Sequence, residues 1–376
     1  MTGLVPGLHP NTICILFLGF VFGDPLLVSV LIVSSAIAHS FLDFLPSILL
    51  GAPDPGTALS VLPGHNMMMQ GRAYEAIRLT VIGGLASLLI ALTLMPLLMF
   101  FVGSFYDFIR PNIHWLLVTI TGFMFLKDRK PWSLVVFAMS GALGYLVLNG
   151  NLLGRFSLLP MLTGLFGLSM IIKSLKDRTR IPEQKISADA LRRIDVVKGG
   201  LVGSLSGILV GLLPGVGAAQ ATFISREVLR DRTEKKFMIA MGGVNTVVAI
   251  FSLLALWIVG NPRSGVAVAV DELMGVLTFG DVIIFIGAIA LAGGLSSLIT
   301  IYLSKRFINF FRRIDYRKVS LSIIIFLIAI TFVFTGAVGT FVLFLSTAIG
   351  MVCILTNTRR SYMMACIIVP TVLFFI

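Results

Sequence analysis

The chain has 376 residues, of which 57% are apolar and only 12% are charged, and its formal net charge is +12. A soluble globular domain could not bury this much hydrocarbon, so the composition excludes that class and indicates an integral membrane protein. The sequence contains neither His-Glu-x-x-His nor Gly-x-Ser-x-Gly, and its four histidines are scattered. We therefore expect no enzyme, no metal site and no cofactor.

Uncharged apolar runs of spanning length recur along the chain. They predict an all-α polytopic membrane protein with about ten transmembrane helices. The last long run ends before Arg359 and is cut at Gly336 or Gly339 into two spans. The predicted spans cover residues 26–50, 76–103, 112–126, 132–149, 158–173, 237–259, 281–304, 319–335, 337–354 and 360–376.

Basic residues separate onto one side of the predicted membrane. If the loop at residues 127–130 is cytoplasmic, alternation of the spans places all but three of the 29 Lys and Arg residues on that side. The exceptions are Arg110, Arg155 and Arg263. Because this asymmetry follows the positive-inside rule, we expect a multi-pass protein of the cell membrane with cytoplasmic basic loops and both termini extracytoplasmic. The net charge then reflects topology, and no nucleic-acid partner is expected.

Three short patterns occur twice in the same order, at a spacing of roughly 210 residues. Residues 3–8 (Gly-Leu-Val-Pro-Gly-Leu) return as 211–216, residues 51–53 as 260–262, and residues 83–88 as 293–298. Internal duplication with Gly/Pro-interrupted apolar segments at matching places is typical of secondary transporters and points to their binding site.

The segment at residues 199–225 is apolar, yet basic clusters flank it on both sides. A true span would place one cluster outside, so we expect a re-entrant hairpin with Pro214 and Gly215 at its tip. The copy around Pro6 and Gly7 should enter from the outer face. Five spans follow each hairpin, so the second unit must be inverted. The predicted organisation is a first repeat at 1–173, a basic cytoplasmic linker at 174–198 and a second, inverted repeat at 199–376.

Each Pro-Gly break separates two half-helices, because proline lacks the backbone donor and glycine loosens the chain. A half-helix that begins at mid-membrane presents unpaired N–H groups and the positive end of its dipole, which suits an anion. The alternative is a kinked, packed span without a ligand. The candidate substrate-binding residues around the two tips are Pro6, Gly7, His9, Asn11, Thr12, Pro214, Gly215, Gly217 and Gln220.

Other polar residues beside these motifs are candidates for the same cavity. Thr57, Arg263 and Ser264 lie in the second duplicated element and could bind the substrate, or could be loop residues that face water. Asn245 and Thr246 could face the cavity or make an interhelical contact. His39 and Asp43 are four residues apart and share a helix face, so with Asp54 they are candidates for coupling to H+ or Na+.

The motif residues resemble a known family. Residues 3–8, 211–218 (Gly-Leu-Leu-Pro-Gly-Val-Gly-Ala), 51–73 and 242–246 (Gly-Gly-Val-Asn-Thr) are similar to the large membrane subunit of tripartite tricarboxylate transporters. The resemblance implies an ion-coupled carboxylate permease that works with a small membrane subunit and an extracytoplasmic solute-binding protein. Residues 4–12 are more distantly similar to polyprenyl-phosphate translocases.

The sequence therefore predicts a secondary active transporter of an anionic substrate that works by alternating access. The substrate's negative group would lie between the two half-helix N-termini. The alternative is a lipid-carrier flippase in which a polyprenyl phosphate uses the same anion site. The expected partners are an anionic small molecule or a lipid phosphate and the membrane lipids, and a homo-oligomer is also compatible with the sequence.

Overall fold

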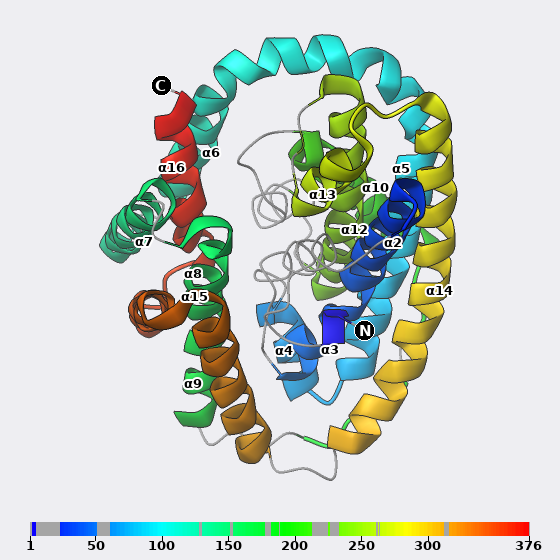
Figure 1. Cartoon of the computed structure of the whole chain (residues 1–376). Coiled ribbons are helices and arrows are strands. Elements are labelled where there is room, and N and C mark those ends of the chain that lie inside the picture. The colour runs from blue at the N-terminus through cyan, green and yellow to red at the C-terminus, as the bar shows by residue number, and fades with distance from the viewer. Residues whose placement is uncertain are drawn as a thin grey trace.

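All regular secondary structure in the part of the chain that the computed structural model describes is helical (Figure 1). This part comprises residues 2–4, 23–50, 61–127, 130–150, 153–176, 182–187, 189–212, 225, 233–260, 262, 264–311 and 316–375. Its helices are η1 (Thr2–Leu4), α2 (Pro25–Leu42), α3 (Phe44–Leu50), α4 (Val61–Met69), α5 (Ala73–Ile109), η2 (Arg110–Asn112), α6 (Ile113–Lys127), α7 (Pro131–Asn149), η3 (Gly154–Phe156), α8 (Leu158–Leu162), η4 (Thr163–Leu168), α9 (Ser169–Lys176), α10 (Arg193–Leu212), α12 (Glu234–Val259), α13 (Gly265–Met274), α14 (Phe279–Phe311), α15 (Tyr316–Leu355), η5 (Arg360–Met364) and α16 (Ala365–Phe375).

The predicted all-α membrane class is confirmed. Seven helical segments of the described chain are long and apolar enough to cross a membrane, and three shorter apolar segments lie at 117–126, 158–173 and 360–374. Each predicted span coincides with one of these segments or with part of one. The break expected near residue 336 is also present, because Gly336 interrupts α15 with a φ of 63° and a ψ of −158°. Only glycine adopts this backbone conformation at little cost.

Helix α10 was expected to be one limb of a re-entrant hairpin. It has 20 residues and is itself long enough to be a candidate span. It begins at Arg193, ahead of the apolar segment, because Asp195 in its first turn accepts hydrogen bonds from Arg192 at 2.9 and 3.2 Å. The tip around Pro214 lies outside the described residues, so the re-entrant hairpin stays a prediction.

The helices pack into two groups, which we call the first body and the second body (Figure 1). The first body contains η1, α2, α3, α4, α5, α10, α12, α13 and α14; the second contains α6, α7, η3, α8, η4, α9, α15, η5 and α16. Extensive contacts between described elements fall within one body or the other, apart from the α5–η2–α6 junction. Helix α5 contains Pro96 and bends across the top of the view to reach α6.

Equivalent helices of the two repeats run in opposite directions. Helix α12 begins at Glu234, 209 residues after α2 begins at Pro25, and the two run oppositely in Figure 1. Helices α5 and α14, which carry the duplicated Gly-Gly pairs, are also opposed. Packing is reciprocal, since α5 packs on α12 and α14 packs on α2. Each repeat therefore completes the core of the other.

Glycines allow these helices to approach backbone to backbone. A Cβ atom at Gly83 of α5 would overlap the carbonyl oxygen of Ile239 on α12, and one at Gly242 of α12 would overlap the carbonyl oxygen of Thr80 on α5. Lipid-embedded helices associate through such small-residue contacts, because hydrocarbon tails are as apolar as the side chains and provide no hydrophobic drive. The α5–α12 interface thus depends on the absence of side chains at two positions.

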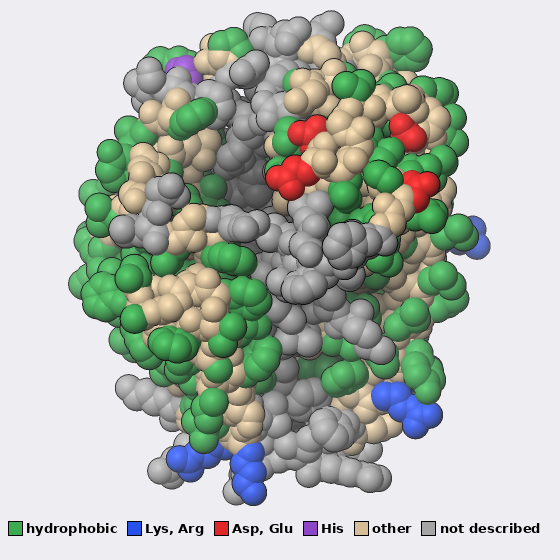
Figure 2. Space-filling view, in the orientation of Figure 1, with side chains coloured by type: hydrophobic (Ala, Val, Ile, Leu, Met, Phe, Trp, Pro, Cys, Tyr) green, Lys and Arg blue, Asp and Glu red, His purple; other side chains and the backbone are tan. Residues whose placement is uncertain are grey.

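Charged side chains separate along the long axis of the molecule (Figure 2). Most of the Lys and Arg side chains visible in this view gather at the bottom, where α9, α14 and α15 have their basic ends, and acidic side chains lie nearer the top. Between them the visible surface of the described residues is largely apolar. This separation is what the positive-inside prediction requires, but which end faces the cytoplasm stays a prediction.

We expect Gly83→Ala to lower the stability of the protein by about 1–3 kcal/mol, because one methyl group would push α5 away from α12. Gly103→Ala is the matched control on the same helix, since a Cβ there would meet nothing within 4 Å. Alanine also favours a helix over glycine, so the control should unfold at the same or a higher temperature. Thermal denaturation of both variants in detergent measures the difference, and equal melting temperatures would contradict the packing described above.

Candidate functional site

A buried polar cluster joins α2 of the first repeat to α12 of the second. The Nδ2 atom of Asn245 donates to Oδ2 of Asp43 at 2.9 Å and to the carbonyl oxygen of Ser40 at 3.2 Å. The hydroxyl oxygens of Ser40 and Thr246 lie 3.3 Å apart. Asp43, Ser40 and Thr246 are buried, whereas Asn245 is partly exposed. The cluster therefore has a closed side within the helices and an accessible side at Asn245.

The position of Asp43 is electrostatically unusual. It directly follows α2, and its backbone N–H donates to the carbonyl oxygen of His39 at 2.9 Å. The negative end of a helix dipole disfavours a carboxylate there, and an ionisable group inside a membrane helix is costly in its own right. The amide donor of Asn245 offsets part of this cost. Such residues are functional candidates by default in membrane proteins.

The start of each Pro-Gly motif packs at an equivalent place. A Cβ at Gly3 would lie 2.9 Å from the carbonyl oxygen of His39 and 3.0 Å from Cβ of Leu42. A Cβ at Gly211 would lie 3.0 Å from the carbonyl oxygen of Val248 and 2.8 Å from Cβ of Phe251. The partners differ by 209 positions in both cases, and the two glycines differ by 208. The two glycines of the duplicated motif thus pack against equivalent atoms of equivalent residues.

A second polar contact lies further along α12. The hydroxyl oxygens of Ser252 and Ser264 are 2.9 Å apart, and Ser264 also caps α13 by accepting from the backbone N–H of Ala267 at 3.2 Å. Ser252 follows Asn245 by seven residues, so both lie on the same face of α12, about 10 Å apart. Ser252 is also the repeat equivalent of Asp43. Each Pro-Gly motif therefore begins beside a buried polar position.

The structure brings together residues that the sequence assigned to different roles. Asp43 was a coupling candidate and Asn245 a substrate candidate, yet the two are in direct contact. His39 is buried one turn before Asp43, as their spacing predicted. Ser264 belongs to the second contact. The remaining candidates lie outside the described residues: Pro6, Gly7, His9, Asn11, Thr12, Thr57, Pro214, Gly215, Gly217, Gln220, Arg263 and Asp54.

Two polar residues of these contacts, Ser40 and Ser252, were not among the candidates from the sequence. Both are small residues on apolar helices. Ser252 could have been found from the repeat spacing, because it occupies the position of Asp43 in the second copy. Nothing in the local sequence marks Ser40, whose partner Thr246 is 206 residues away.

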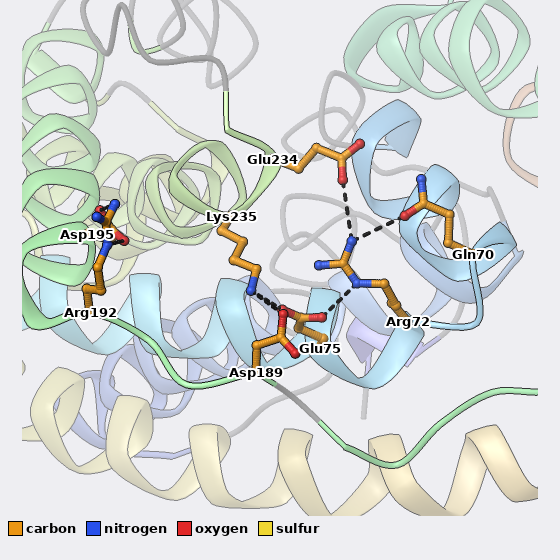
Figure 3. Close-up of polar contacts among 8 residues, drawn as sticks. All are labelled: Gln70, Arg72, Glu75, Asp189, Arg192, Asp195, Glu234 and Lys235. Atoms are coloured by element: carbon orange, nitrogen blue, oxygen red, sulfur yellow. Dashed lines mark hydrogen bonds and ion pairs between the residues drawn. The ribbon is translucent and has the colours of Figure 1, made fainter.

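A separate network of charges holds the linker between the repeats (Figure 3). Glu75 pairs with Arg72 at 2.8 Å and with Lys235 at 3.0 Å, and Lys235 pairs with Asp189 at 2.6 Å. The hydrogen bond from Lys235 lowers the pKa of Asp189. Arg72 also lies 3.8 Å from Glu234. These contacts join the linker to the first turns of α5 and α12, and each charge has an opposite partner.

The linker also makes uncharged contacts with the first body. Gln184 is buried; its side chain accepts from the backbone N–H of Ala73 at 3.1 Å and donates to the carbonyl oxygen of Met68 at 2.8 Å. The backbone N–H of Lys185 donates to Gly71 at 2.9 Å. The described part of the predicted linker is therefore fixed to the turn between α4 and α5, which a basic composition alone does not predict.

Among the described residues, no group of three His, Cys, Asp or Glu side chains is placed to hold a metal ion. The α2–α12 cluster offers a buried carboxylate, an amide and two hydroxyl groups, and the contact between Ser252 and Ser264 adds two more hydroxyl groups. Oxygen ligands of this kind suit a hard cation or a proton, and the amide N–H also suits an anion.

Comparison with known proteins gives a family. A protein-family model described as the tripartite tricarboxylate transporter TctA family matches residues 1–365. The chain is 31% identical to an uncharacterized protein of Methanocaldococcus jannaschii over 392 aligned residues, which cover 100% of this chain and 96% of that protein. It is 23% identical to an uncharacterized 52.8 kDa protein of Agrobacterium vitis over 324 residues, 75% of this chain and 63% of that protein. No solved structure matches the chain.

A charge swap tests the contact between the repeats. Asn245→Asp places two carboxylates against each other in a buried site. We therefore expect the free energy of unfolding to fall by about 1–3 kcal/mol. The double variant Asp43→Asn/Asn245→Asp restores one carboxylate and one amide, and its melting temperature should return toward that of the wild type. A double variant no more stable than Asn245→Asp would show that the two side chains are not partners.

Proposed function

The chain belongs to the tripartite tricarboxylate transporter TctA family, and on that premise we propose that it is a secondary active transporter of a carboxylate anion. Membership makes the protein a multi-pass membrane transporter. The proposal adds the substrate class, the site and the mechanism. The single observation that carries it is the equivalent packing of Gly3 and Gly211 beside the polar positions Asp43 and Ser252.

The proposed substrate site lies between the two Pro-Gly motifs. Pro6 and Pro214 each follow the packed glycine by three residues, and three residues of chain span at most about 11 Å. Both motifs are thereby tied to the region of the α2–α12 cluster. If each break begins a half-helix, its free N–H groups and positive dipole end would bind the substrate's negative group. Thr57, Arg263 and Ser264, from the second duplicated element, would complete the site.

The proposed mechanism is alternating access by inverted repeats. The opposed directions of α2 and α12, and of α5 and α14, support this proposal. So does the division into two bodies, which are connected at opposite ends of the view, through α5 to α6 at the top and from α14 to α15 at the bottom. Movement of the first body against the second would expose the site to each side in turn. Pro96 lies inside α5 and Gly336 interrupts α15, and these two residues are the proposed hinges.

We propose that Asp43 is the residue that couples transport to H+ or Na+. Its carboxylate is buried and bonded to Asn245, which is partly exposed. In this proposal the exposed part of Asn245 faces the substrate site. A proton or Na+ at Asp43 would change the charge beside the bound anion and would thereby link the two binding events. His39 and Asp54 are the further coupling candidates. As in the family, a small membrane subunit and an extracytoplasmic solute-binding protein are the proposed partners.

Transport by the purified protein in liposomes tests the substrate site. We expect uptake of a citrate-like acid by the wild type and its loss in Gly7→Leu and Gly215→Leu, because a bulky side chain at a half-helix start would occupy the anion's place. Both variants should still insert into the membrane, which size-exclusion chromatography checks. Unchanged uptake would contradict the site. Movement of a polyprenyl phosphate without citrate uptake would support the lipid alternative instead.

Neutralisation of the buried carboxylate tests coupling. Asp43→Asn should lower ion-driven uptake at least about tenfold, the equivalent of one charge-assisted contact. Asp24→Asn is the control: Asp24 is the exposed N-cap of the same helix, and asparagine caps a helix equally well. Exchange of substrate across liposomes without an ion gradient should survive in Asp43→Asn. Equal ion-driven uptake by the two variants would exclude Asp43 from coupling.

A further inference from the structure

Arg360 is a buried cation whose charge is not balanced by the described residues. It is the first residue of η5 and only 8% exposed. Its Nη1 atom is buried without a hydrogen-bond partner, and its Nη2 atom contacts the sulfur of Met170 on α9. Within the described part of the chain, no carboxylate forms an ion pair with this guanidinium. Arg360 therefore differs from Arg72, Arg192 and Lys235, which all pair with carboxylates.

An arrangement of this kind is costly. A guanidinium remains protonated in proteins, so burial cannot neutralise it. A thioether sulfur is a weak acceptor and replaces little of the lost hydration. A buried charge is normally paired and hydrogen-bonded. The Nη1 atom of Arg360 can therefore still donate hydrogen bonds to a bound anion.

The charge of Arg360 also acts on a basic side chain of the first body. His65 lies on α4, and its Nδ1 atom is 3.2 Å from the carbonyl oxygen of Ile48. Burial lowers the pKa of His65 and the bond to Ile48 opposes that shift, while the positive charge of Arg360 lowers the pKa further.

We propose that Arg360 forms an oxyanion-binding site, separate from the site at the Pro-Gly motifs. Its ligand is a carboxylate or a phosphate group, because a guanidinium is always charged and donates several hydrogen bonds to such oxygen atoms. This inference deepens the proposed function: an anion bound at Arg360 would occupy a second binding position for the substrate.

Anion-dependent stability of the purified full chain tests the site. Citrate at constant ionic strength should raise the melting temperature of the wild type, since a ligand that binds only the folded state stabilises it. In Arg360→Gln the citrate concentration needed for half of the effect should rise about 10- to 100-fold. Arg359→Gln removes the same charge from the exposed neighbouring residue and should behave as the wild type.

Measurement without added anion distinguishes a ligand site from a structural charge. Arg360→Gln should then be at least as stable as the wild type, because it removes an uncompensated buried cation. If a carboxylate of the chain neutralises Arg360, the variant will be less stable at every citrate concentration, and the proposal is wrong. Equal citrate responses of Arg360→Gln and Arg359→Gln would also overturn it.

The same titrations in a Gly215→Leu background separate the two anion sites. The citrate response that depends on Arg360 should persist there although transport is lost. Titration with inorganic phosphate and with a short-chain polyprenyl phosphate distinguishes a solute from a lipid headgroup as the source of the oxyanion. Transport without a response at Arg360 would overturn this inference alone, whereas an Arg360-dependent response without any transport would overturn only the proposed function.

Discussion

The bond between Asn245 and Asp43 is the constraint around which the rest of the described site is arranged. Membrane helices gain little from bringing apolar faces together, so close backbone contact and polar bonds must hold them. Here a carboxylate at the unfavourable end of α2 receives its donor from α12, a helix of the other repeat. This bond therefore joins the two copies directly and contributes to fixing their relative position.

Much of the fold could be predicted because it depends on local features of the sequence. Apolar length located the spans, and the same reasoning predicted an interruption of the last long run at Gly336 or Gly339, of which Gly336 is the one that breaks α15. Helix α10 begins ahead of the apolar segment at 199–225 because its first turn is stabilised by Arg192 and Asp195, which hydropathy does not detect. The ordered linker could not be predicted either, since Gln184 acts through bonds to Met68 and Ala73, more than a hundred residues earlier.

The sequence pointed to single residues of the α2–α12 cluster but not to the contacts between them. Helix spacing placed His39 and Asp43 together, and the polar character of Asn245 singled it out on an apolar helix. Their meeting depends on the reciprocal packing of α5 on α12 and of α14 on α2, which no local pattern encodes. The repeat spacing does encode part of it. Gly3 and Gly211 are 208 residues apart, and their partners Leu42 and Phe251 are 209 residues apart.

Two buried charges of the protein, those of Glu75 and Arg360, differ in how they are compensated. At the linker, Glu75 is buried but bonded to Arg72 and Lys235, so its charge is compensated within the fold and can serve stability alone. Arg360 is buried to a similar degree, yet among the described residues its guanidinium has a hydrogen-bonding contact only with the thioether sulfur of Met170. The charges at the linker are paired, and such pairing stabilises the fold. A buried charge without a counter-charge, such as that of Arg360, lowers the stability of the fold instead. The difference is explained if the charges at the linker stabilise the fold and Arg360 binds an anionic ligand.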